Sequence, residues 1–144
     1  MSGLVTTGYE GRDAAEVVAL LRQAGVARLV DVRATPLSRK PGLSKNRLAA
    51  ALAEAGIAYE HRPELGVPKP DRDAFRRGDA APREALRGRL RTGEGAAAVA
   101  AVTAAARAER VALLCFEADV AACHRGVVAE EILVAAPDLP VTHL

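Results

Sequence analysis

The chain has 144 residues, half of them apolar, which excludes a disordered protein and allows one domain with a core of its own. Aromatic residues make up only 3%, so the core has to be built from Ala, Val and Leu. The net charge of +2 is far from the basicity of a dedicated nucleic-acid-binding protein.

Strand and helix signals alternate through the first half of the chain. An apolar strand at residues 4–9 is followed by Asp13 and Glu16, which have capping-box spacing and predict a helix that ends at Gly25. The next expected elements are a strand at 28–33, a loop at 35–42, a helix at 44–56 and a strand at 57–61.

The second half begins with a loop at 62–70. Residues 71–91 are polar and predict a broken helix, in which Pro82 suits a first helical turn. The remaining expected elements are an Ala-rich helix at 94–107, a strand at 111–115, a helix at 123–135 and a short edge strand at 140–144.

This alternation predicts a single α/β domain over residues 1–144, with three layers and a mainly parallel sheet of four or five strands. The apolar residues Leu29, Val30 and Val32 suit a second strand that is covered on both faces. We expect the core to contain Leu4, Val5, Leu29, Val30, Val32, Ile57, Leu113 and Leu114.

No stretch approaches the roughly 20 apolar residues of a membrane span, and no secretory signal is visible. We therefore expect a cytoplasmic protein without membrane association. In that compartment Cys115 and Cys123 are expected to be thiols rather than a disulfide. The sequence does not indicate an oligomeric state.

Polar residues follow each predicted parallel strand, and such strands deliver them to one edge of the sheet, where ligands bind in open α/β folds. Each of these polar residues, taken alone, could serve only to cap a loop or form an ion pair. Folding does not require all of them to lie at the same edge. They are Tyr9, Glu10, Asp31, Arg33, His61, Glu64, Cys115 and Glu117.

Cys123, His124 and Arg125 stand where the last helix is expected to begin. The helix N-terminus and the Arg125 charge would lower the pKa of a Cys123 thiol and activate it as a nucleophile, with His124 as its base. Alternatively the three residues only cap the helix. Cys115, inside an apolar strand, is expected to be a core residue.

Several named chemistries fail on spacing. A cysteine-phosphatase or rhodanese loop needs an arginine at a fixed distance after the cysteine, where this chain has Ala121 and Ala129. Neither a Walker A motif nor Gly-x-Gly-x-x-Gly is present, so no nucleotide cofactor is indicated. Cys115, Cys123 and His124 lack the short paired spacing of zinc ligands, and we expect no metal.

Two loops are rich in cations, and either a solvated face or a basic rim for phosphates explains them. Few aromatic residues are available to stack on bases, which argues against a single-strand platform. The cations are Arg33, Arg39, Lys40, Lys45, Arg47, Arg62, Lys69, Arg72, Arg76 and Arg77.

The motifs occur in an order that resembles the family called domain of unknown function 488 (DUF488), over nearly the whole chain. They are Thr7-Gly8-Tyr9-Glu10-Gly11-Arg12, Asp31-Val32-Arg33 with Pro36 and Ser38, Tyr59 before Glu64-Leu65-Gly66, and Leu114-Cys115-x-Glu117 with Cys123-His124-Arg125. Members typically have a second glycine where this chain has Val67. The resemblance implies a small α/β domain and no established activity.

Our hypothesis is an enzyme acting on a small anionic, phosphate-bearing substrate, such as a nucleotide or nucleic acid, without a cofactor. The expected catalytic residues are Glu10, Asp31, Glu117, Cys123 and His124; the expected substrate-binding residues are Tyr9, Arg12, Arg33, Glu64 and Arg125. The alternative is a non-catalytic module that binds anions or nucleic acid through the basic loops.

Overall fold

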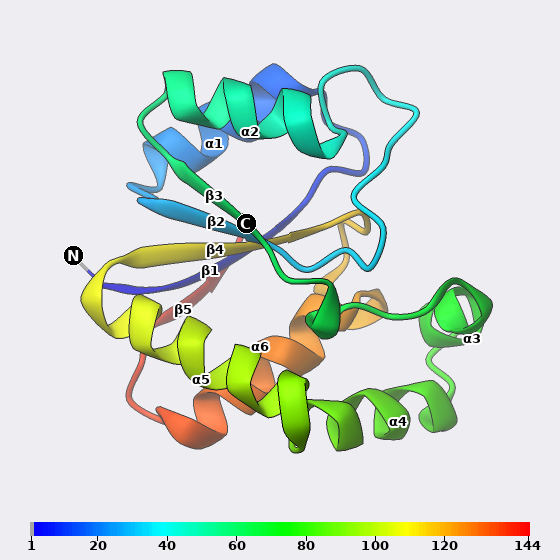
Figure 1. Cartoon of the computed structure of the whole chain (residues 1–144). Coiled ribbons are helices and arrows are strands. Elements are labelled where there is room, and N and C mark those ends of the chain that lie inside the picture. The colour runs from blue at the N-terminus through cyan, green and yellow to red at the C-terminus, as the bar shows by residue number, and fades with distance from the viewer. Residues whose placement is uncertain (1) are drawn as a thin grey trace.

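The computed structural model describes residues 2–144 and contains one five-stranded parallel sheet in the order β3-β2-β4-β1-β5 (Figure 1). The strands are β1 (Gly3–Gly8), β2 (Arg28–Asp31), β3 (Ala58–His61), β4 (Arg110–Cys115) and β5 (Val141–His143). All neighbouring pairs are parallel, so the carboxyl ends of all five strands lie at the same edge.

Helices cover both faces of the sheet (Figure 1). On one face lie α1 (Ala14–Gln23) and α2 (Lys45–Glu54); on the other lie α4 (Ala80–Leu90), α5 (Gly93–Ala108) and α6 (His124–Ala135), with the short α3 (Arg72–Arg76) beside the carboxyl edge. Each face has its own apolar cluster, so the central strands are buried on both sides.

The predicted fold class is confirmed. All eight expected core residues are buried, none more than 4% exposed. The capping box of Asp13 and Glu16 starts α1. The polar segment divides into α3 and α4 around Gly78. Gly78 has a φ of +87°, a left-handed conformation that ends α3 and that glycine adopts without strain.

Several predicted boundaries shift by one or two residues at the sheet edge, among them the end of the first strand, at Gly8 instead of residue 9. The second strand ends at Asp31 instead of residue 33. The last helix begins at His124, because Cys123 has extended backbone angles and is its N-cap. Among residues 2–144, no helix combines the length and apolar character needed to cross a membrane.

Glycines allow the backbone to pack closely at this edge. A Cβ at Gly8 would lie 2.5 Å from the carbonyl carbon of Glu117, and one at Gly66 would lie 2.5 Å from the amide nitrogen of Ala34. Neither neighbour can rotate away, since both are backbone atoms. Gly66 thus brings the loop after β3 against the loop after β2, where the site is formed.

Candidate functional site

A pocket of about 340 Å³ opens at the carboxyl ends of β1, β2 and β4. Its walls are apolar, formed by Leu37, Val67, Phe75 and Phe116. Five cationic side chains and one carboxylate also line it: Arg33, Arg39, Lys40, Arg72, Arg76 and Glu117. An excess of cations thus surrounds an apolar cavity, in the position where parallel sheets bind ligands.

A buried ion pair between Asp31 and Arg33 forms the inner wall. Arg33 Nε and Nη2 donate to the Asp31 carboxylate at 2.9 and 2.7 Å, and Tyr59 Oη donates to it at 2.6 Å. Burial by itself would lower the pKa of Arg33, but the hydrogen bonds and charge of Asp31 outweigh it and raise that pKa. Asp31 is fully buried, so it holds Arg33 and does not reach a ligand.

Arg33 also holds the loop that forms the rim. Its Nη1 donates to the Leu43 carbonyl at 2.7 Å and to Tyr9 Oη at 3.3 Å. Lys40 reaches back across the loop, where Nζ donates to the carbonyls of Tyr9 and Arg12 at 2.8 and 3.0 Å. Because carbonyl oxygens are neutral, the positive charge of Lys40 remains uncompensated at the pocket.

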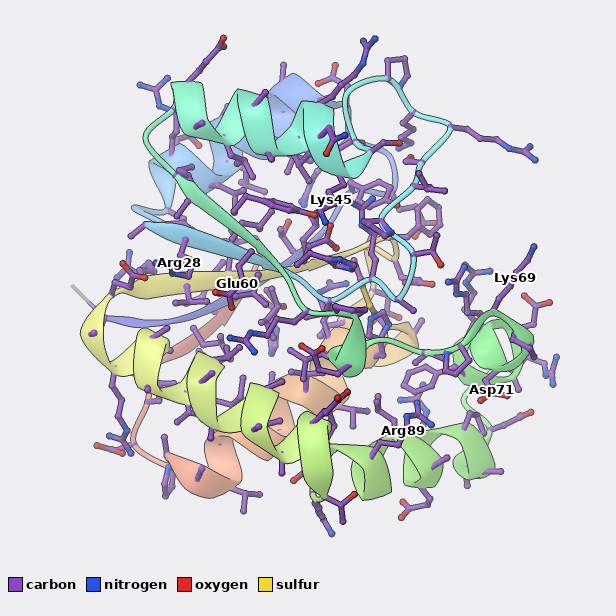
Figure 2. All side chains as sticks on the ribbon, viewed as in Figure 1. Arg28, Lys45, Glu60, Lys69, Asp71 and Arg89 are labelled. Carbon is purple, nitrogen blue, oxygen red and sulfur yellow. A yellow bond between two sulfur atoms is a disulfide. The ribbon has the colours of Figure 1, made fainter. Side chains whose placement is uncertain are left out.

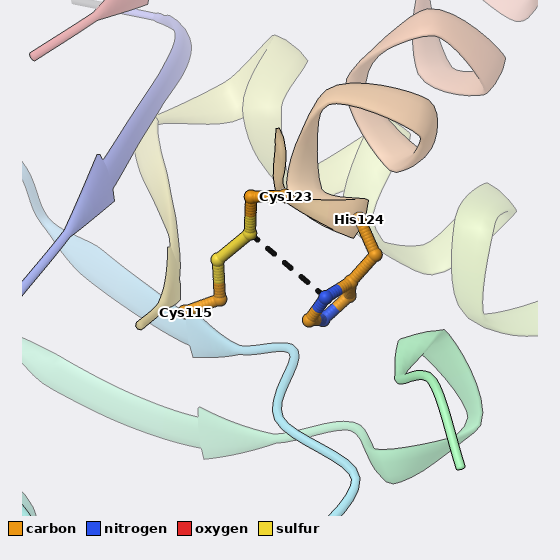
Figure 3. Close-up of side chains that lie close together, drawn as sticks. All are labelled: Cys115, Cys123 and His124. Atoms are coloured by element: carbon orange, nitrogen blue, oxygen red, sulfur yellow. Dashed lines mark hydrogen bonds between the residues drawn. A yellow bond between two sulfur atoms is a disulfide. The ribbon is translucent and has the colours of Figure 1, made fainter. Parts of the chain in front are cut away.

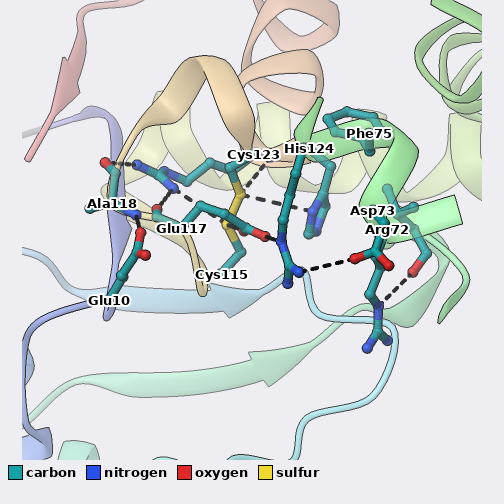
Figure 4. Close-up of polar contacts among 12 residues, drawn as sticks. Glu10, Arg72, Asp73, Phe75, Cys115, Glu117, Ala118, Cys123 and His124 are labelled. Atoms are coloured by element: carbon teal, nitrogen blue, oxygen red, sulfur yellow. Dashed lines mark hydrogen bonds and ion pairs between the residues drawn. A yellow bond between two sulfur atoms is a disulfide. The ribbon is translucent and has the colours of Figure 1, made fainter. Parts of the chain in front are cut away.

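Glu117 is the carboxylate of the lining, and it is held between two groups (Figure 4). Oε1 accepts from Arg76 Nε at 2.8 Å, and this hydrogen bond raises the pKa of Arg76. Oε2 lies 3.6 Å from Cys115 Sγ. Glu117 is therefore placed to accept a proton from a group in the pocket.

Cys115 lines the pocket and meets Cys123 behind the lining, although the two come from the end of β4 and the start of α6. The expectation of two separate thiols is contradicted, because the structure joins them in a disulfide. Both are 1% exposed, so Cys123 is as buried as Cys115. Linear spacing did not reveal this contact, which depends on the intervening turn folding back.

His124 lies beside the sulfurs and lines the pocket. Its Nε2 is 2.9 Å from the Val32 carbonyl, and its Nδ1 faces Cys123 Sγ at 3.9 Å. Burial lowers the pKa of His124, and the Val32 carbonyl opposes this shift only in part. The imidazole is thus neutral near pH 7 and presents one nitrogen lone pair to the sulfurs.

Arg125 is fully buried and does not line the pocket. Its guanidinium donates to the carbonyls of Glu117 and Ala118, and Nη1 lies 3.4 Å from Cys115 Sγ. Burial lowers the pKa of Arg125, which has no ion pair within residues 2–144. Here it positions the turn after β4 and does not contact the cavity.

Besides Cys123, three other predicted site residues lie outside the lining. Glu10 accepts from the Ala118 amide at 3.0 Å, and Arg12 donates to the Thr7 hydroxyl at 3.0 Å. Glu64 lies 3.9 Å from an Arg62 nitrogen. The structure brings Tyr9, Arg33, Glu117 and His124 to the pocket and leaves these three in supporting loops.

The apolar walls were not anticipated. Phe116 packs edge-on against Tyr9 with ring centroids 5.4 Å apart, and Phe75 faces the His124 ring at 6.3 Å. Phe116 directly follows Cys115 at the end of β4, and this position could have identified it from the sequence as a residue of the site. Phe75 comes from a polar segment far away in sequence, and nothing local marks it.

Residues 13–132 match the family described as "Domain of unknown function DUF488". The chain belongs to this DUF488 family. The match covers β2, β3, β4 and their loops, so the Asp31–Arg33 pair and the cysteine, histidine and glutamate cluster of this DUF488 protein all lie within it. Neither the curated proteins nor the solved structures compared with the chain include a match.

Proposed function

We propose that this DUF488 protein is an enzyme that binds a small phosphate-bearing anion in the pocket and acts on it there. The observation that carries the proposal is the excess of five cationic side chains over one carboxylate in an apolar-walled cavity at the carboxyl edge of the sheet. Low-dielectric walls strengthen the attraction between fixed cations and an anion.

Arg39 and Arg72 are the side chains assigned to the anion. Arg39 is exposed and makes no hydrogen bond or ion pair within residues 2–144. Within residues 2–144 the Arg72 guanidinium donates only to the Val67 carbonyl, at 3.4 Å, so its charge is not neutralised. Arg33 is not assigned to the anion, because its charge is paired with Asp31 and its Nη1 donates to the Leu43 carbonyl and Tyr9 Oη.

Glu117 is the group assigned to proton transfer. It lies in the lining, 15% exposed, and Arg76 fixes the direction of its carboxylate. Of the other predicted acids, Asp31 is fully buried and Glu10 is turned to a backbone amide. An attacking water held between Glu117 and a bound phosphate ester would lose its proton to this carboxylate as its oxygen bonds to phosphorus. The P–O bond to the leaving alcohol then breaks, and the leaving oxygen takes a proton from solvent.

The test is calorimetric binding of inorganic phosphate and a nucleoside monophosphate, together with turnover of p-nitrophenyl phosphate and its diester. Arg72→Gln and Arg39→Gln should each weaken binding about 10-fold, since one charge-assisted contact is worth about 1.5 kcal/mol or more. Glu117→Gln should lose turnover and keep binding.

Arg89→Gln is the matched control, because Arg89 is an exposed arginine on α4 outside the pocket (Figure 2). Absence of binding at millimolar ligand, or equal loss in Arg89→Gln and Arg72→Gln, would overturn the pocket assignment. Binding that Glu117→Gln leaves intact, with no turnover by the unmodified protein, would favour a non-catalytic anion-binding module.

A further inference from the structure

Three potential metal ligands lie together beside the pocket, and two of them, Cys115 and His124, line it. Cys115 Sγ, Cys123 Sγ and a ring nitrogen of His124 are all within 4.8 Å of one another (Figure 3). Two sulfurs and one imidazole form the ligand set of zinc sites that keep one position open. The three residues lack the sequence spacing of zinc ligands, but the fold brings them together.

The His124 ring is already oriented for coordination. The Val32 carbonyl can only accept, so His124 Nε2, 2.9 Å away, carries the proton. Nδ1 is then the unprotonated nitrogen, and it is the one that faces Cys123 Sγ. A backbone carbonyl that binds the far ring nitrogen is the usual partner of a metal-ligating histidine.

Both sulfurs also have a donor suited to a thiolate. Arg125 Nη1 lies 3.4 Å from Cys115 Sγ, and the Arg125 backbone amide lies 3.5 Å from Cys123 Sγ (Figure 4). The Arg125 guanidinium is fully buried, and its other acceptors are neutral carbonyls. Thiolates beside it would supply the negative charge that this buried cation otherwise lacks.

The backbone spacing suits two ligands around an ion. The Cα atoms of Cys115 and Cys123 are 7.2 Å apart, beyond the roughly 4.4–6.8 Å usual for disulfides. Two thiolates on one tetrahedral zinc have sulfurs about 3.8 Å apart, given Zn–S bonds of about 2.3 Å. This Cα separation leaves room for a shared ion between the two sulfurs once the disulfide is reduced.

We propose that the reduced protein binds one Zn²⁺ ion through Cys115, Cys123 and His124 Nδ1, with its fourth position open to the pocket. Oxidation to the disulfide removes both thiolates and abolishes the site. The proposal does not depend on the phosphate-bearing substrate, because metal binding is measured without any ligand in the pocket.

The experiment compares the oxidised and the reduced chain. A phosphine reductant breaks the S–S bond, and with one water it becomes the phosphine oxide while two thiols form. After the phosphine is removed without air, added Zn²⁺ displaces the two thiol protons, which pass to the buffer. We expect one equivalent of Zn²⁺ per reduced chain and none per oxidised chain, measured against a chromophoric chelator.

Co²⁺ provides an independent readout. In the reduced chain it should give a thiolate-to-cobalt charge-transfer band and the intense visible absorption of a tetrahedral site. Cys123→Ser and His124→Asn should each weaken Zn²⁺ binding more than about 100-fold, beyond the roughly 10- to 100-fold loss on removing an outer hydrogen-bond partner of a ligand.

His61→Asn is the matched control, because His61 Nε2, like that of His124, lies close to a backbone carbonyl, here that of Arg33 at 2.7 Å. It should bind Zn²⁺ as the unmodified chain does. A reduced, folded chain that takes up no Zn²⁺, or uptake unchanged in Cys123→Ser and His124→Asn, would overturn the proposal. A reduced chain that unfolds and regains its circular dichroism spectrum with Zn²⁺ supports it; one that stays unfolded overturns it.

Discussion

At the residue scale, the Asp31 carboxylate accepts four hydrogen bonds at the sheet edge. It accepts from the Arg33 guanidinium, from the Arg33 backbone amide at 3.1 Å and from Tyr59 Oη. Arg33 in turn binds the Leu43 carbonyl and so fixes the loop that forms the rim. One buried carboxylate thus connects β2 and β3 to the shape of the pocket.

Asp31→Asn should destabilise the protein by about 3–5 kcal/mol, because it leaves the Arg33 charge buried without a counter-ion. Urea unfolding followed by circular dichroism measures the loss. The double variant Asp31→Asn/Arg33→Met should recover part of it, since the unpaired charge is then gone. If the double variant loses as much free energy of unfolding as the two single variants together, the two side chains act independently.

Tyr59 gives a prediction for alkaline pH. Burial and the negative charge of Asp31 raise the pKa of Tyr59 above its ordinary value of 10. Above that pH the unfolded chain loses the phenolic proton while the folded chain keeps it. The stabilisation from Tyr59 is therefore complete below about pH 10 and declines as the pH rises further.

Tyr59→Phe should cost about 1.5 kcal/mol at pH 8, the size of a hydrogen bond to a charged group, and less at pH 11. Urea unfolding of both chains at the two pH values gives the difference. In Tyr9→Phe, where Tyr59 is the remaining tyrosine, tyrosinate absorbance should appear only above pH 10. An equal cost at both pH values would contradict the assigned shift.

At the element scale, two glycines in neighbouring helices have opposite surroundings. Gly88 in α4 has open space where a Cβ would stand, whereas a Cβ at Gly95 in α5 would collide with the Arg89 carbonyl. Gly95 is buried where the end of α4 meets the start of α5. It is therefore required for this close packing of the two helices, while Gly88 is not.

Gly88→Ala should stabilise the protein by up to about 1 kcal/mol, because alanine is the better helix former. Gly95→Ala should destabilise it by about 1–3 kcal/mol, since backbone atoms have to move to admit the methyl group. Thermal unfolding of the matched pair measures both. A stabilising Gly95→Ala would show that α4 and α5 can separate without cost.

Local patterns predict the elements well because each one depends on nearby residues. The spacing of Asp13 and Glu16 suffices for a capping box, and the apolar run before Cys115 suffices for a buried strand. The pocket depends on contacts between loops. Gly66 against Ala34 and Phe75 beside His124 join segments whose meeting no local pattern encodes.

At the scale of the whole molecule, the net charge is small, but cationic side chains gather around the pocket. The net charge is only +2, so the long-range field of the chain is weak. The cations at the pocket, by contrast, exceed the carboxylates that line it. This distribution suits a compact anion held at close range better than a polyanion attracted along a surface.

Ionic strength therefore separates the two functional hypotheses. A polyanion that contacts many cations releases counter-ions, and affinity falls by about 10³–10⁵ between 50 and 200 mM salt for 6–10 phosphate contacts. For a nucleoside monophosphate held by Arg39 and Arg72, added salt over that range only screens the attraction between the phosphate and the two arginines.

We expect monophosphate affinity to fall less than about 10-fold between 50 and 200 mM salt, with Arg72→Gln reducing this dependence further. Fluorescence anisotropy with a labelled monophosphate and a labelled single-stranded oligonucleotide of about 20 nucleotides measures both ligands on one chain. Oligonucleotide binding that is tight at low salt, steeply salt-dependent and insensitive to Arg72→Gln would instead place the binding surface on the wider basic loops. The module would then bind nucleic acid, and the pocket would not be its principal site.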